Sequence, residues 1–106
     1  MNKILTPKEE ELLKALKDVI DPELMVNIVD LGLVYDLTID EEKKTVNIDL
    51  TLTSPGCPLG DMITEDTRQM TDSVLPGYEI DIKLVWNPPW SFEMMTEDGR
   101  NALYRR

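Results

Sequence analysis

The spacing of apolar residues predicts a helix near the start of the chain. Thr6-Pro7-Lys8-Glu9 has the pattern of a capping box, with proline at the first helical position. The apolar stripe that follows consists of Leu12, Leu13, Leu16, Val19 and Ile20. Because the residue before a proline disfavours helical backbone angles, this helix is expected to end near Asp21.

Two stretches of alternating polarity then predict a β-hairpin. The inward residues of the first strand are expected to be Leu33, Tyr35, Leu37 and Ile39. Charged residues 40–44 form the turn. The inward residues of the second strand are expected to be Val46, Ile48, Leu50 and Leu52. Its opposite face is expected to carry Asn47, Asp49, Thr51 and Thr53. Residues 21–32, ahead of the hairpin, have no clean period.

A second helix and a third strand complete the pattern. The helix has an apolar side made of Leu59, Met62, Ile63, Met70 and Val74. It is expected to end before Pro76-Gly77, and Ile80, Ile82 and Leu84 then alternate with charged residues as a strand. A short last helix is expected from about Thr96 through Leu103.

This order of elements predicts an α/β fold of the two-layer α+β type. The elements run α-β-β-α-β-α, and a strand–helix–strand unit implies a right-handed parallel crossover beside the antiparallel hairpin. The result is a small mixed three-stranded sheet with helices packed on one face. At 106 residues, the chain is expected to form a single domain over residues 1–106.

Composition excludes several classes of partner. The net charge of −10 repels phosphate backbones and anionic lipids, so neither nucleic acid nor a membrane surface is expected as a partner. No apolar run approaches the roughly 20 residues needed to span a bilayer, and no targeting segment is recognised. One cysteine cannot form an intramolecular disulfide, which fits a cytoplasmic location.

The absence of histidine restricts the chemistry further. A chain with no histidine has no imidazole base, no Cys–His pair and no imidazole metal ligand. One protomer can offer a metal a single thiolate and oxygen ligands. A closed zinc site, or a cluster held by one subunit, is therefore excluded unless a second chain or an exogenous ligand contributes.

The lone cysteine lies where a strand is expected to give way to a helix. Pro58 suits the first helical position, which makes Cys57 the expected N-cap, with free N–H groups and the positive helix end near its sulfur. Such a position favours the thiolate. The alternative is a buried cysteine that packs as a small hydrophobe. Expected supporting residues are Asp21, Glu23, Thr51, Thr53 and Ser54, although acidic loop residues and strand threonines also occur without any such role.

The segment after the third strand leaves two interpretations open. Pro88 and Pro89 cannot continue a strand, because they lack ladder donors. The apolar residues that follow are Trp90, Phe92, Met94 and Met95. They either close one end of the core or form an exposed surface for docking a partner.

Four segments together resemble the metal–sulfur cluster biosynthesis family, which includes SufT-like maturation factors and PaaD-like proteins. These segments are Asp21-Pro22-Glu23-Leu24, Val29-Asp30-Leu31-Gly32-Leu33-Val34, Leu52-Thr53-Ser54-Pro55-Gly56-Cys57-Pro58 and Pro88-Pro89-Trp90-Ser91. The resemblance implies an α/β domain related to iron–sulfur assembly scaffolds and a cytosolic role in supplying clusters to recipient proteins. The family's motif cysteine matches Cys57, its acidic pair matches Asp21 and Glu23, and its hydroxyls match Thr51 and Thr53. PaaD-like members usually carry a cysteine-rich C-terminal segment, which a chain with one cysteine lacks.

The leading hypothesis is a non-catalytic maturation factor in which Cys57 transiently ligates iron or an iron–sulfur cluster, alone or shared between subunits. Its expected partners are the assembly machinery and recipient apoproteins, with a homodimer as a further option. One alternative is a non-ligating adaptor that docks through Trp90–Met95; another is a PaaD-like assembly subunit for an aromatic-degradation oxygenase. A thiol-dependent enzyme ranks last, because no resident base and no resolving cysteine accompany the thiol.

Overall fold

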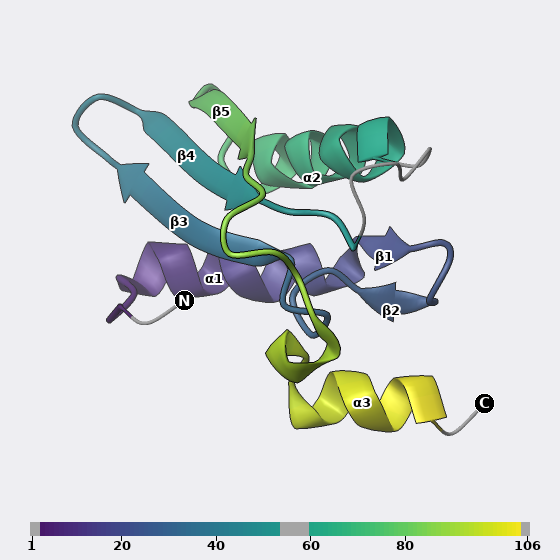
Figure 1. Ribbon diagram of the computed structural model, residues 1–106. Helices are drawn as coiled ribbons and strands as arrows, with labels where there is room; N and C mark the ends of the chain where they lie inside the picture. The colour runs from purple at the N-terminus through teal and green to yellow at the C-terminus, as the bar shows by residue number, and fades with distance from the viewer. Residues whose placement is uncertain (1–2, 54–59, 105–106) are drawn as a thin grey trace.

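The computed structural model describes residues 3–53 and 60–104 (Figure 1). Its helices and strands are α1 (Pro7–Ala15), the 3-10 turn η1 (Leu16–Asp18), β1 (Ile20–Asp21), β2 (Val26–Asn27), β3 (Val34–Asp40), β4 (Thr45–Leu50), α2 (Gly60–Val74), β5 (Glu79–Leu84), the 3-10 turn η2 (Phe92–Met94) and α3 (Glu97–Tyr104). No helix among these residues is long and apolar enough to cross a bilayer.

The main sheet has the order β3-β4-β5, with β3 antiparallel and β5 parallel to β4. α1 packs on β3, α2 packs on β5, and the two helices also contact each other (Figure 1). The predicted fold class and mixed three-stranded sheet are therefore confirmed. An additional two-stranded sheet, β1-β2, forms in the stretch that has no clean period, and α3 packs against β2.

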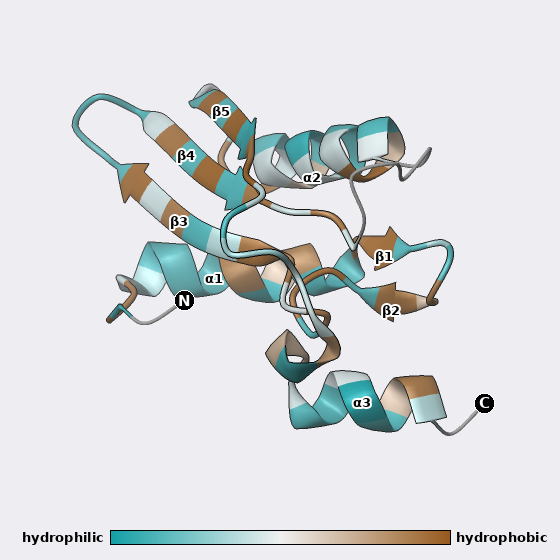
Figure 2. Cartoon of the chain, in the orientation of Figure 1, coloured by the Kyte–Doolittle hydropathy of each residue, from teal (hydrophilic) through white to brown (hydrophobic). Residues whose placement is uncertain are grey.

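The core lies between the main sheet and the two long helices. Apolar and polar residues alternate along β4 (Figure 2), and Val46, Ile48, Leu50 and Leu52 are all buried, as predicted. Burying one apolar side chain of this size contributes about 1.5–3 kcal/mol of transfer free energy. The alternation along β4 therefore fixes which side of the sheet faces the helices.

The first helix begins as predicted but ends earlier. The Thr6 side chain accepts a hydrogen bond from the Glu9 backbone at 3.2 Å, and Glu9 Oε1 accepts one from the Thr6 backbone at 3.0 Å. The expected end near Asp21 is wrong, because α1 stops at Ala15 and Ile20 is already in a strand. Antiparallel pairing of Ile20 with Asn27 overrides the helical pattern, and the Ile20 side chain is 42% exposed instead of buried.

A β-bulge changes which residues of the third strand face inward. Val34 pairs with Leu50, whereas Asp36 pairs with the adjacent Asp49, so Tyr35 is the extra residue. Val34 is buried and Tyr35 is only half-buried, which corrects the prediction that Tyr35 faces the core. The second strand shows a related difference, because it ends at Leu50 and Thr51 is fully buried instead of lying on the open face.

Candidate functional site

The predicted site straddles the connection between β4 and α2. Cys57 and Ser54 lie outside the described residues, so their predicted roles remain untested by the structure. Both ends of this connection are held in place, because the backbone of Gly60 packs against Leu52. A Cβ atom on Gly60 would lie 2.6 Å from Leu52 Cδ1. The described residues on either side of the thiol segment are therefore in close contact: buried Leu52 follows β4, and Gly60 is the first residue of the 15-residue helix α2.

Asp21 is a buried carboxylate that organises its own turn. Its side chain is only 1% exposed, and Oδ1 accepts hydrogen bonds from the backbone N–H groups of Glu23 at 2.8 Å and Leu24 at 3.2 Å. The Asp21 carbonyl accepts a further bond from Met25, whose φ of 58° is left-handed. This turn brings β2 back onto β1. Glu23, the second predicted carboxylate, is exposed at the surface of the same turn.

Thr51 carries a buried hydroxyl that has no hydrogen-bond partner among the described residues. Its backbone N–H donates to the Leu33 carbonyl at 2.8 Å, which fixes the residue beside the end of β3. Its side chain is fully buried, and Oγ1 bonds to none of the residues that the structure describes. Leaving a polar group unpaired in this way costs about 1–3 kcal/mol. Thr53, the other predicted hydroxyl, is half-buried at a bend two residues later.

The Tyr35 hydroxyl connects the bulge in β3 to the segment after β5. It donates to the Pro88 carbonyl at 2.7 Å and also lies 3.1 Å from the Met94 sulfur. Burial raises the pKa of Tyr35 above its ordinary value of 10.0, and the neighbouring Thr51 side chain opposes part of this rise. Although Thr51 is close enough to influence the phenol, the geometry between the two hydroxyls is not that of a hydrogen bond.

A groove of about 580 Å³ lies beside this phenol. Its walls include Val29, Val34, Tyr35, Pro88 and Met94. Sequence patterns give no indication of the groove, because its residues come from α1, from the loop before β3, from β3 itself and from the segment after β5. Its lining is mainly apolar, so it suits an apolar side chain better than an ion.

The four residues predicted as a docking surface do not share one environment. The Trp90 indole donates to the Leu31 carbonyl at 2.6 Å, and its ring meets the Phe92 ring edge-on at 5.1 Å. Met95 is 5% exposed and belongs to the core, while Met94 is half-buried in the groove. Phe92 alone of the four is a large exposed apolar residue, at 54%.

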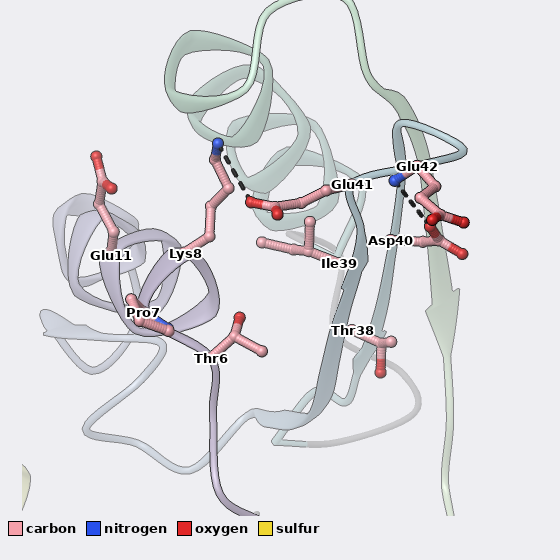
Figure 3. Close-up of a pocket in the computed structure, with 9 residues that line it drawn as sticks. All are labelled: Thr6, Pro7, Lys8, Glu11, Thr38, Ile39, Asp40, Glu41 and Glu42. Carbon is pink, nitrogen blue, oxygen red and sulfur yellow. Dashed lines mark hydrogen bonds and ion pairs between the residues drawn. The ribbon is translucent and has the colours of Figure 1, made fainter.

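A second hollow of about 690 Å³ lies between the start of α1 and the β3–β4 turn (Figure 3). Its rim is acidic, and Figure 3 shows Lys8 reaching across it to Glu41, with the Lys8 nitrogen 3.4 Å from a carboxylate oxygen. The other acidic residues of the rim are Glu11, Asp40 and Glu42. Within residues 3–53 and 60–104, no three histidine, cysteine, aspartate or glutamate side chains converge as metal ligands.

Glu9 is buried next to this hollow and bonds to two segments. Oε1 accepts the capping-box bond from Thr6, and Oε2 accepts the Ile39 backbone N–H at 2.9 Å. Burial opposes ionisation, but the two backbone donors, with help from Lys3, outweigh it and lower the pKa of Glu9 below 4.5. The sequence predicts only the capping half of this arrangement, since Ile39 is 30 residues away.

Comparison with known proteins agrees with the resemblance inferred from the four sequence motifs. Residues 9–82 match the family described as iron-sulfur cluster assembly protein. The chain is 41% identical over 95 residues to the Fe-S protein maturation auxiliary factor YitW of Bacillus subtilis, covering 90% of this chain and 92% of that protein. It is 40% identical over 85 residues to the Fe-S protein maturation auxiliary factor SufT of Staphylococcus aureus, covering 80% of this chain and 96% of that protein.

A solved structure is also similar to this chain in fold and sequence. The crystal structure of a domain of unknown function, DUF59, from Bacillus anthracis superimposes with a TM-score of 0.87 at 45% identity, covering 93% of both chains. The family match spans residues 9–82, which include β4 and α2, the elements on either side of Cys57 in the sequence. The resemblance to SufT-like proteins inferred from four short motifs is therefore confirmed over most of the chain. This chain belongs to the iron–sulfur cluster assembly protein family.

Proposed function

We propose that this protein is a maturation auxiliary factor that helps to deliver iron–sulfur clusters to recipient apoproteins, with Cys57 as a transient ligand of the cargo. The observation that carries the proposal is near full-length similarity to relatives named as Fe-S protein maturation auxiliary factors. Its partners are the iron–sulfur assembly machinery and recipient apoproteins. We expect it to act as a carrier or adaptor in the cytoplasm, without catalysing a reaction.

The number of metal-binding side chains in each protomer determines how the cargo is held. One cysteine and no histidine leave each protomer a single soft ligand, whereas a cluster ordinarily takes about four thiolates. Binding by one protomer is therefore incomplete, and the remaining ligands come from a recipient, a second subunit or a small thiol. Incomplete ligation suits transfer, because the cargo can leave without the protein unfolding.

We propose distinct roles for the residues predicted to support the thiol. Asp21 stabilises the turn between β1 and β2 through two backbone N–H groups, so we assign it to ordering the site and not to binding metal. Thr51 has a buried hydroxyl without a partner among the described residues, and we propose that it donates to the cargo or to the Cys57 sulfur. Thr53, Ser54 and Glu23 supply further polar groups in our proposal.

Anaerobic reconstitution with iron and sulfide tests ligation directly. Visible absorption and bound iron are measured for the wild type, for Cys57→Ser and for Cys57→Ser/Ser73→Cys. The last variant keeps one thiol per chain but moves it to an exposed position on α2. We expect cluster absorption only with Cys57 in place. Equal colour in all three proteins would remove the support for a ligand at this position.

A gene deletion tests the role in cells. Activities of several iron–sulfur enzymes are assayed after deletion and after complementation with wild type or Cys57→Ser. We expect lower activities on deletion, restored by the wild type alone. Unchanged enzyme activities after deletion would contradict the maturation role, and full rescue by Cys57→Ser would contradict only the ligand role.

A non-ligating adaptor is the second candidate, and the exposure of Phe92 favours it. Trp90 and Met94 are unsuited to testing it, because their side chains bond or pack within the protein. Phe92→Ala removes an exposed ring and its edge contact with Trp90, and it leaves the Trp90–Leu31 and Tyr35–Met94 hydrogen bonds in place. Loss of partner capture by Phe92→Ala, with normal capture by Cys57→Ser, would favour the adaptor. Exposed Tyr104→Ala serves as the matched control.

A further inference from the structure

The outer side of β5 is open. Among the described residues β5 pairs only with β4, and Figure 1 shows no element beyond it in the sheet. The Glu79 N–H donates to the Lys44 carbonyl at 2.8 Å and the Val85 N–H to the Leu50 carbonyl at 2.9 Å. Since backbone groups alternate in direction along a strand, the N–H and C=O groups of Ile80, Ile82 and Leu84 point away from β4.

The opposite edge of the sheet is covered. Glu9 Oε2 accepts the outward N–H of Ile39 in β3, and Lys3 bonds to Thr38 and Asp36 on the same strand. On β5 the only such contact among the described residues is from Arg68, which donates to the Ile80 carbonyl at 3.0 Å. A carbonyl oxygen has two lone pairs, so this contact leaves room for a second donor.

The side chains of β5 form two distinct rows. Ile80 and Ile82 are half-buried on the side of the helices, and Leu84 is 42% exposed at the end of that row. The other row, Glu79, Asp81 and Lys83, is exposed on the open face of the sheet. The edge therefore offers unpaired backbone groups, incompletely covered apolar side chains and two adjacent opposite charges.

We propose that β5 pairs antiparallel with β5 of a second copy of this chain, about a two-fold axis at Ile82. Ile82 then exchanges backbone hydrogen bonds with its counterpart, and Ile80 exchanges them with Leu84 of the partner subunit. On the open face Asp81 lies opposite Lys83 of the partner subunit, and the symmetry repeats that pair. The two three-stranded sheets become one continuous sheet of an isologous dimer.

Charge and proline positions select this register over its neighbours. An axis at Ile80 would place Asp81 opposite Glu79 of the partner subunit, and like charges directly opposite destabilise a strand pair. An axis at Leu84 would place Ile80 opposite Pro88 of the partner subunit, which has no N–H to donate. Only the axis at Ile82 matches both the charged row and the outward backbone groups.

The interface is small, so a weak and concentration-dependent dimer is expected. It consists mainly of one short strand per copy, and each copy carries a net charge of −10. In this dimer the two β4 strands run in opposite directions. Each chain therefore leaves β4, toward the segment that carries Cys57, at the opposite end of the sheet from its partner. The dimer therefore goes beyond the proposed function and does not depend on Cys57. Cys57→Ser is expected to leave it unchanged.

Charge exchange tests the pairing. The dimer dissociation constant is measured by sedimentation equilibrium for wild type, Asp81→Lys, Lys83→Asp and the double variant. Each single variant places like charges opposite each other twice, and about tenfold weaker association is expected. The double variant restores opposite charges and the wild-type net charge, so it should recover wild-type association. Failure of the double variant to recover would overturn the pairing.

Backbone donors provide an independent test. Leu84→Pro removes an N–H that points away from β4, so β4–β5 pairing survives while the Ile80–Leu84 pairs across the axis are lost. Leu84→Ala retains the N–H and is the control for the lost side chain. We expect Leu84→Pro to weaken the dimer much more than Leu84→Ala. A wild type that stays monomeric at the highest soluble concentration, or a dimer unaffected by both sets of variants, contradicts the proposal.

Discussion

Buried carboxylates in this protein act mainly as acceptors for backbone N–H groups. Asp21 accepts two such bonds within its own turn, and Glu9 accepts one from Thr6 and one from Ile39. For Glu9, these backbone donors stabilise the ionised carboxylate and lower its pKa. The sequence marks Asp21 as a site residue, but the structure gives it an ordering role that the acidic motif by itself does not distinguish from ligation.

Glu9→Gln should destabilise the fold by about 1–3 kcal/mol near neutral pH, because an amide accepts these donors more weakly and presents its own N–H to one of them. The pKa of Glu9 is lowered in the folded state, so its stabilisation is complete above 4.5, the ordinary value, and is lost as pH falls through the folded-state value. Urea unfolding of both proteins at neutral and at acidic pH measures this. Exposed Glu10→Gln is the control, and an equal loss at both pH values would contradict the mechanism.

Thr51→Val should leave stability unchanged or raise it by up to about 1 kcal/mol, since a methyl group of similar shape replaces a buried hydroxyl that has no partner among the described residues. In the same variant we expect weaker retention of iron after anaerobic reconstitution, because the proposed donor to the cargo is gone. The two measurements are independent. A large loss of stability would show that the hydroxyl has a structural partner.

At the scale of elements, local patterns predict the regular strands and helix starts but not the interruptions. The alternation along β4 and the capping box of α1 are both confirmed. The bulge at Tyr35 and the β1–β2 pair have no local signature, because each depends on a partner strand. Gly32 is a further feature that local patterns do not predict, since its φ of 80° and its contact with the Met94 carbonyl reflect packing between distant segments.

Gly32→Ala should lower the free energy of unfolding by about 2–4 kcal/mol, because the new Cβ would be strained at positive φ and would overlap the Met94 carbonyl oxygen. Gly77→Ala is a matched control: its φ is 86°, but a Cβ there meets nothing within 4 Å. It should show the backbone strain alone. Urea unfolding of the two variants separates the cost of backbone strain from the cost of the overlap with Met94. Equal losses of stability in the two variants would argue against the close contact.

At the scale of the whole molecule, the segment after β5 returns across the protein and holds the bulged end of β3. Tyr35 bonds to Pro88, 53 residues away, and Trp90 bonds to Leu31, 59 residues away. Three of the four predicted docking residues are thereby used in packing, which leaves Phe92 as the exposed one. Sequence patterns identify this segment as apolar but cannot tell closure of the core from docking, because both need the same residue types.

Tyr35→Phe should cost about 0.5–1.5 kcal/mol near neutral pH through the lost bond to Pro88. Burial raises the pKa of Tyr35 in the folded state, so the wild-type advantage is complete below 10.0 and is lost as pH rises through the folded-state value. Urea unfolding at neutral pH and above 10.0 checks the trend. Exposed Tyr104→Phe should have little effect at either pH, and a wild-type advantage that grows with pH would be the wrong sign.

The sequence by itself determined the order of the three α-helices and the three strands of the main sheet, the inward row of β4, the single thiol without histidine and the family motifs. These features follow from spacing over a few residues or from composition, and both are the same whether or not the chain is folded. Only the tertiary structure decided that Asp21 is buried, that Tyr35 leaves the inward row, that Glu9 reaches Ile39 and that, among the described residues, one sheet edge is covered while the other is open. Each of these depends on which distant segment lies alongside, as in the Glu9–Ile39 hydrogen bond across 30 residues and the Tyr35–Pro88 hydrogen bond across 53.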